Sequence, residues 1–120
     1  MPPRAAVAIP LTTEGVPLAE AFAATGPAST RFAAASSDDG ALFIVSDENL
    51  GSGALTLRVF EPDGAPRAEV AIPVSAPPSP SERLGVVASG DGDSAVVVWT
   101  VQDGAFDAAD VLGARIDCLR

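Results

Sequence analysis

The sequence contains no histidine, lysine or tyrosine, and its single cysteine is Cys118. Without histidine, a Ser-His-Asp triad cannot form, and without lysine there is no amine for a Schiff base. One cysteine excludes an intramolecular disulfide, and without a histidine partner it is a poor nucleophile; an intermolecular disulfide through a frayed end of the chain stays open. There is also no Gly-x-Ser-x-Gly elbow and no P-loop. We therefore expect that the chain is not an enzyme.

Positive charge is scarce, since seven basic residues face sixteen acidic ones and the formal net charge is −9. This charge repels nucleic acid and anionic membranes, so neither is expected as a partner. The longest bulky apolar runs, 42–45 and 96–99, have the length of a strand and not of a membrane span. The apolar stretch 5–11 is interrupted by Pro10 and makes a poor signal peptide, which leaves open a cytoplasmic location or a start other than Met1. The expected partner is an unidentified protein or glycan.

Aromatic residues are few, with five phenylalanines and one tryptophan, although 48% of the chain is hydrophobic. Short apolar runs alternate with Gly, Asp and Pro, which predicts strands and turns. The segment 19–24 could form one helical turn, but Pro17 and Pro27 enclose it too closely for a stable helix. The sequence therefore predicts a single all-β region over residues 1–120.

Four strands are predicted in the central part of the chain, at 31–36, 41–46, 54–60 and 69–74. The second is a continuous apolar run and is expected to be buried on both faces. A stiff proline-rich linker at 77–80 follows the fourth strand and suits a crossing between two sheets.

The pattern then restarts, so the chain contains an internal repeat. The matched segments are 31–36 with 83–88, 38–40 with 90–92, 42–45 with 95–98, 55–59 with 112–116, and 14–20 with 63–69. The spacing between matched positions runs from 49 residues (14 to 63) to 57 residues (55 to 112). In this alignment Arg115 corresponds to Arg58. The predicted units are a partial repeat 1–28 and two longer repeats, 29–77 and 78–120, and the complete unit has the antiparallel four-stranded make-up of a propeller blade.

The order of these motifs resembles blade-like repeats that occur in tandem in large secreted bacterial proteins. It consists of an acidic turn and an apolar run ending in tryptophan, as in 91–99, and of a strand with arginine followed by Asp-Gly-x-Pro, as in 57–66. The resemblance covers roughly residues 5–117. It implies a β-propeller-like binding or structural scaffold, without catalysis and with unknown ligand, in an extracellular or cell-envelope setting. The chain departs from the pattern at Ser46, where the second repeat has Trp99, and this implies uneven packing between the units.

The copy number excludes a closed monomeric propeller. At a period near 50, 120 residues give about 2.4 units, whereas propellers close with about four to eight blades. Three arrangements stay open: a homo-oligomer that completes a ring, a two-sheet sandwich, and part of a longer chain.

Candidate metal ligands lie in the acidic turns. They are Asp38, Asp39, Asp91 and Asp93, with 47–49 as a further group. Hard oxygen ligands suit calcium, which is the one cofactor considered, but the spacing does not fit an EF-hand loop. Asp and Gly are also the residues that tight hairpin turns require, so the turn interpretation is favoured.

Two further residue types have rival interpretations. Trp99 is expected to pack in the core, with stacking on a sugar ring as the alternative. Arg58 and Arg115 are expected to pair with nearby acids. The rival functions are a calcium-binding structural β-sandwich and, least favoured, a carboxylate-based glycan-active enzyme, since no two carboxylates are placed face to face by the sequence.

Overall fold

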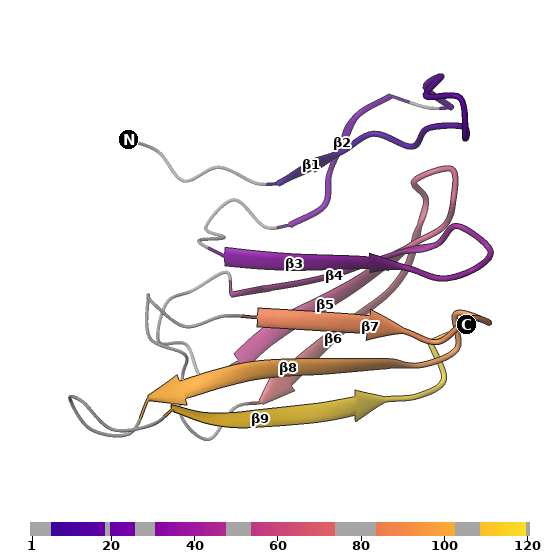
Figure 1. Ribbon diagram of the computed structural model, residues 1–120. Helices are drawn as coiled ribbons and strands as arrows, with labels where there is room; N and C mark the ends of the chain where they lie inside the picture. The colour runs from indigo at the N-terminus through magenta and orange to yellow at the C-terminus, as the bar shows by residue number, and fades with distance from the viewer. Residues whose placement is uncertain are drawn as a thin grey trace, which may run out of the picture.

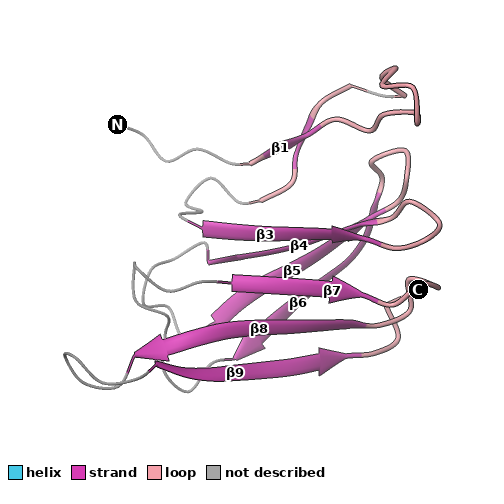
Figure 2. Ribbon diagram, in the orientation of Figure 1, coloured by secondary structure: helices cyan, strands magenta, loops and turns pink. Residues whose placement is uncertain are grey.

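The structure, a computed structural model, describes residues 6–18, 20–25, 31–47, 54–73, 84–102 and 109–119. All regular secondary structure in these ranges is β-strand, as the all-β prediction requires (Figures 1 and 2). The strands form three antiparallel sheets of two, four and three strands. No helix in this part of the chain is long and apolar enough to cross a membrane.

Strands that follow one another in the sequence are also neighbours in each sheet, with orders β1-β2, β3-β4-β5-β6 and β7-β8-β9. Such meanders arise because short turns can join only antiparallel strands. The strand bounds are β1 (Val7–Ala8), β2 (Phe22–Ala23), β3 (Arg31–Ser36), β4 (Leu42–Asp47), β5 (Ala54–Phe60), β6 (Pro66–Pro73), β7 (Leu84–Ala88), β8 (Ala95–Gln102) and β9 (Ala109–Ile116).

The bounds of β3 and β5 agree with the predicted 31–36 and 54–60. Strand β6 begins at Pro66 and not at 69, because a proline at the first residue of an edge strand removes no essential ladder bond. The segment that could have formed a helical turn contains strand β2 instead. The linker 77–80 lies outside the described residues.

The main core lies between the four-stranded and the three-stranded sheet. Phe43, Val45 and Leu57 are fully buried on one face of the β3–β6 sheet, which we call its front face. They pack in one cluster with Val97 and Trp99 of the β7–β9 sheet. Trp99 is therefore a core residue, as the packing interpretation predicted.

The opposite, back face of the β3–β6 sheet packs against the hairpin β1–β2. Leu42, Ile44 and Phe60 lie in a second cluster with Phe22 and Ala24, and the rings of Phe22 and Phe60 have centroids 4.8 Å apart. The three sheets are thus three layers, with the hairpin on one side of β3–β6 and β7–β9 on the other (Figure 1). Strand β4 is buried on both faces as predicted, because a layer covers each of them.

The C-terminal segment is fastened to the main core. Leu119 is buried in it, and its backbone N–H donates a hydrogen bond of 2.8 Å to the carbonyl oxygen of Asp93. Cys118 is exposed and has a positive φ of 62°. The chain is therefore packed as far as Leu119, while an intermolecular disulfide through the exposed Cys118 stays an untested possibility.

Candidate functional site

The turn between β3 and β4 is organised by Ser37. The backbone N–H of Gly40 donates to the Ser37 carbonyl at 3.0 Å, and the Ser37 hydroxyl donates to the Asp39 carboxylate while it accepts from the Ala41 N–H at 3.2 Å. Gly40 has a φ of +88°, which a residue without a β-carbon adopts without strain. A serine, an aspartate and a glycine thus close this turn together.

The turn between β7 and β8 repeats these contacts. The Gly92 N–H donates to the Ser89 carbonyl at 3.0 Å. The Ser89 hydroxyl donates to Asp91 at 2.7 Å and accepts from the Ser94 N–H at 3.0 Å. One additional residue, Asp93, is accommodated before the strand resumes, and its N–H donates to Asp91 at 3.0 Å.

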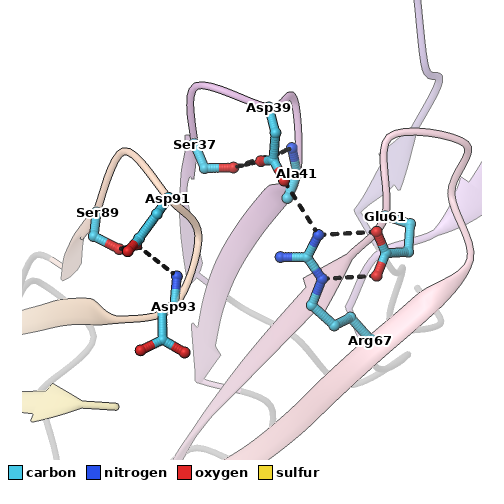
Figure 3. Close-up of polar contacts among 8 residues, drawn as sticks. All are labelled: Ser37, Asp39, Ala41, Glu61, Arg67, Ser89, Asp91 and Asp93. Carbon is cyan, nitrogen blue, oxygen red and sulfur yellow. Dashed lines mark hydrogen bonds and ion pairs between the residues drawn. The ribbon is translucent and has the colours of Figure 1, made fainter. Parts of the chain in front are cut away.

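The two turns lie against each other, although they are far apart in the sequence (Figure 3). The Asp38 N–H donates to the Gly90 carbonyl at 3.0 Å. A β-carbon added to Gly90 would come within 2.7 Å of the Asp38 carboxylate. A larger residue at position 90 would therefore force the Asp38 side chain to move away from the Ser89–Ser94 turn.

An arginine of β6 completes this cluster. Arg67 donates from Nε and Nη2 to the two oxygens of Glu61 at 2.8 and 2.9 Å, and its Nη2 lies 3.6 Å from Asp39 Oδ2 (Figure 3). Only 9% of the Arg67 side chain is exposed. The hydrogen bonds to Glu61 are the main cause that raises the pKa of Arg67 above its ordinary value, against the opposing effect of burial.

Sequence reasoning missed Arg67, although a signal was present. Glu61 and Arg67 flank the turn Pro62-Asp63-Gly64, and a tight hairpin brings the residues on its two sides close together. Arg67 lies at the β-bulge between the pairs Phe60–Pro66 and Val59–Ala68, so it reaches Glu61 diagonally. The pairing could therefore have been expected from the turn alone, whereas the additional contact with Asp39 depends on how separate hairpins pack.

The structure places the candidate calcium ligands in these two turns. Asp39 accepts hydrogen bonds from Ser37 and lies beside Arg67, and Asp91 accepts from Ser89 and from the N–H of Asp93. Within the described ranges, no three or more acids or cysteines gather in an arrangement that could hold a metal ion. Calcium binding by Asp38, Asp39, Asp91 and Asp93 stays an untested prediction.

The further group at 47–49 lies only partly in the described residues. Asp47 pairs with Arg31 at 2.7 Å across strands β3 and β4, and its side chain is 3% exposed. Residues 48 and 49 lie outside the described ranges.

Both arginines of the sequence alignment have acidic partners, as predicted. Arg58 lies 2.9 Å from Glu69 and Arg115 lies 2.9 Å from Asp117. Their alignment with each other, however, is wrong. Arg58 lies opposite Ile44 in the neighbouring strand, whereas Arg115 lies opposite Val96.

The turn contacts explain the difference. They match Ala41 with Ser94, and therefore Ile44 with Val97, whose cross-strand partner is Ala114. Ala114 and not Arg115 thus corresponds to Arg58. The alignment had assumed that corresponding strands show the same face to the apolar core, whereas the two sheets show opposite faces to the core that they share.

A groove of about 380 Å³ lies beside these ion pairs, between the hairpin β1–β2 and the back face of β5 and β6. Its lining combines an aromatic ring, two arginines and an acid: Phe60, Arg58, Arg67 and Glu69, with Ala23, Pro66 and Ala68. We call it the Arg58 groove. Its mixture of paired charges and apolar surface suits a polar ligand with an apolar side.

A second groove of about 340 Å³ lies on the other side of the hairpin contact and is mainly apolar. Its lining includes Ile9, Pro10, Phe22, Leu42 and Pro62. No protein-family model, no curated protein and no solved structure matches the chain.

Proposed function

We propose that this chain is a non-catalytic, propeller-like repeat module that serves as a binding or structural scaffold. The observation that carries the proposal is the way in which the two larger sheets meet. The turn contacts match Phe43 with Val96, so Val96 marks the front face of the β7–β9 sheet and Val97 its back face. The shared core contains Phe43 from the front face of the first sheet and Val97, not Val96, from the second sheet. The front of one sheet therefore packs on the back of the next.

Front-to-back stacking separates this proposal from a sandwich. In a two-sheet sandwich built from two equal units, both units turn the same apolar face inward. Successive propeller blades are related by rotation about a common axis, so each front meets the next back. Strands β3 and β7, the first strands of the two sheets, run in the same direction and contact each other (Figure 1), which supports a shared axis on that side.

The hairpin β1–β2 supports a third unit. Its turn has the bonding of the β5–β6 turn: the Gly15 N–H donates to Thr12 at 2.9 Å, as the Gly64 N–H donates to Glu61 at 2.8 Å. These contacts match Ala8 with Leu57, a front-face residue, and Ala8 packs on the back face of the β3–β6 sheet. The same order of front and back therefore occurs at both contacts between layers.

The charged groups near the grooves favour binding over catalysis. Arg58 and Arg67 form ion pairs with Glu69 and Glu61, with nitrogen-to-oxygen distances of 2.9 and 2.8 Å. Ion-paired side chains of this kind can recognise polar ligands, but the arginines hold the carboxylates in place and so disfavour proton transfer by them. The Arg58 groove is the proposed contact surface, and a glycan or a peptide segment is the proposed ligand class. An extracellular or cell-envelope setting is a further part of this proposal and rests on the resemblance of the repeats.

Incubation with a panel of oligosaccharides and peptides tests the proposal. Bound ligands should be recovered unchanged by mass spectrometry, and Arg58→Ala should weaken binding by about tenfold to a hundredfold, since a charge-assisted hydrogen bond contributes about 1.5–3 kcal/mol. Arg115→Ala is the matched control, because it removes an ion pair outside this groove. Turnover of any panel member would overturn the non-catalytic role, and equal binding by the Arg58 variant would exclude the groove.

A further inference from the structure

The front face of the β7–β9 sheet exposes several large apolar side chains around Arg115, which lies opposite Val96 and pairs with Asp117. Val87, Val96, Val98 and Val111 are between 39% and 70% exposed. Val96 and Val98 correspond to Phe43 and Val45 through the turn contacts, and these two residues of the preceding sheet are 0% exposed. Positions that are fully buried in one unit are thus open to solvent in the next.

A second apolar face is uncovered at the other end of the stack. The hairpin β1–β2 turns Ala6, Ala8 and Phe22 toward the β3–β6 sheet. The alternating residues on the outer side of β1 and the turn that follows it are large, apolar and between 52% and 65% exposed: Val7, Ile9 and Leu11. Exposed apolar surface gathered in this way marks an interaction site more often than scattered single residues do.

The two uncovered faces are of opposite kind. Ala8 corresponds to Leu57 of the front face, so the outer side of the hairpin, with Val7 and Ile9, is a back face. The contacts between layers within the chain each join a front face to a back face. One chain therefore ends in a free back and a free front, which are the kinds of surface that meet inside it.

We infer that a second copy of the chain covers these faces, by stacking head to tail with the front of β7–β9 on the outer side of the neighbouring copy's β1–β2 hairpin. This contact between copies repeats the front-to-back stacking inside the chain, and the inference rests on the proposed function as a stacked scaffold. The contact is heterologous, so it either closes into a ring or extends as a fibre. Because each copy carries a net charge of −9, their mutual repulsion opposes association, and added salt should strengthen it by screening.

Two charge insertions test the pairing of unlike faces. Val96→Arg changes only the front face, where it adds a second positive charge opposite Arg115, and Val7→Arg changes only the outer side of the hairpin; the two valines are 43% and 65% exposed. Sedimentation equilibrium of the wild type should show a multiple of 12.0 kDa from about 10 to about 500 µM, the range of a micromolar contact. Each variant alone should sediment as a single chain.

The mixture of the two variants is the decisive sample. Each variant retains the face that the other has lost, so an equimolar mixture should give twice the mass of one chain and grow no further. Ala65→Arg, an exposed turn residue, controls for the added positive charge and should associate as the wild type does. If Val96→Arg loses its fold by circular dichroism, Val111→Arg replaces it, since that side chain is 70% exposed.

Three results would overturn the inference. A wild type that is a single chain throughout the range would mean that something other than a second copy covers the faces. Association of Val7→Arg alone would indicate that fronts pair with fronts, and association of Val96→Arg alone that backs pair with backs. A single-chain wild type leaves the stacked scaffold itself standing, because the scaffold depends on the internal contact and not on this one.

Discussion

Two adjacent valines of β8 allow the proposed stacking to be measured. Val97 is 0% exposed in the core between the sheets, whereas Val96 is 43% exposed on the opposite face. Strand β8 is the middle strand of its sheet, with β7 and β9 on its two sides, so both residues have the same kind of backbone environment. The same substitution at both positions therefore compares burial against exposure.

The expected costs follow from the surface and volume removed. Replacing Val97 with alanine deletes the equivalent of about two buried CH₂ groups at about 0.8 kcal/mol each, and the cavity left behind adds about 1 kcal/mol. Val97→Ala should thus reduce the free energy of unfolding by about 2–3 kcal/mol. Val96→Ala removes about half of that contact and leaves no enclosed cavity, so it should cost about 1 kcal/mol or less. The loss of strand propensity is similar in both and cancels in the comparison.

Urea unfolding followed by circular dichroism gives both values. With a slope of about 2 kcal/mol per molar urea, the midpoint should fall by about 1–1.5 M for Val97→Ala and by about 0.5 M or less for Val96→Ala. Chain concentrations at which each variant sediments as a single chain keep self-association out of the measurement. Equal losses at the two positions, or a larger loss at Val96, would refute the assignment of Val97 to the face that packs on the β3–β6 sheet.

The remaining predictions concern the turns and their charges. Gly64→Ala should destabilise the fold by about 1 kcal/mol more than Gly15→Ala; both glycines have a positive φ, but the new β-carbon would lie 2.9 Å from Phe22 only at position 64, and equal melting temperatures would contradict this. Arg67→Gln should lower the free energy of unfolding by about 1–2 kcal/mol, a value reduced by the partly exposed acids. Because the pKa of Arg67 is raised, its stabilising contribution is present below its ordinary pKa and is lost only as the pH rises through the folded-state value. Unfolding measured from about pH 7 to about pH 10 should therefore show the same loss of stability in the variant at every pH. Calcium should leave the melting temperature of EDTA-treated protein unchanged, since hydrogen bonds already occupy Asp39 and Asp91, whereas a rise would support the calcium hypothesis.

Local chemistry explains why much of the secondary structure was predictable. The alternation of leucines and polar residues in 54–60 and the Pro-Asp-Gly turn after it give β5 and its hairpin without reference to other sheets. The acidic turns before β4 and β8 were also identified, because Asp and Gly supply the side-chain acceptor and the positive φ that these turns need.

Contacts between distant segments were not accessible to the same reasoning. The bond between Asp38 and Gly90 and the approach of Arg67 to Asp39 join residues from separate hairpins. The alignment of Arg115 with Arg58 failed for the same reason, since it assumed which face of each sheet meets the apolar core.

The apolar runs of β4 and β8 separate the two kinds of information. By itself the sequence determined that 42–45 and 95–98 are strands of similar hydrophobicity, and that an Asp-Gly turn joins each of them to the strand before it. Strand propensity and turn chemistry act over a few residues, so both can be read locally. Only the tertiary structure decided that Ile44 and Phe43 are both covered while Val96 is not. A strand presents its side chains to two sides, and what lies across each side is set by other parts of the chain, or by another chain.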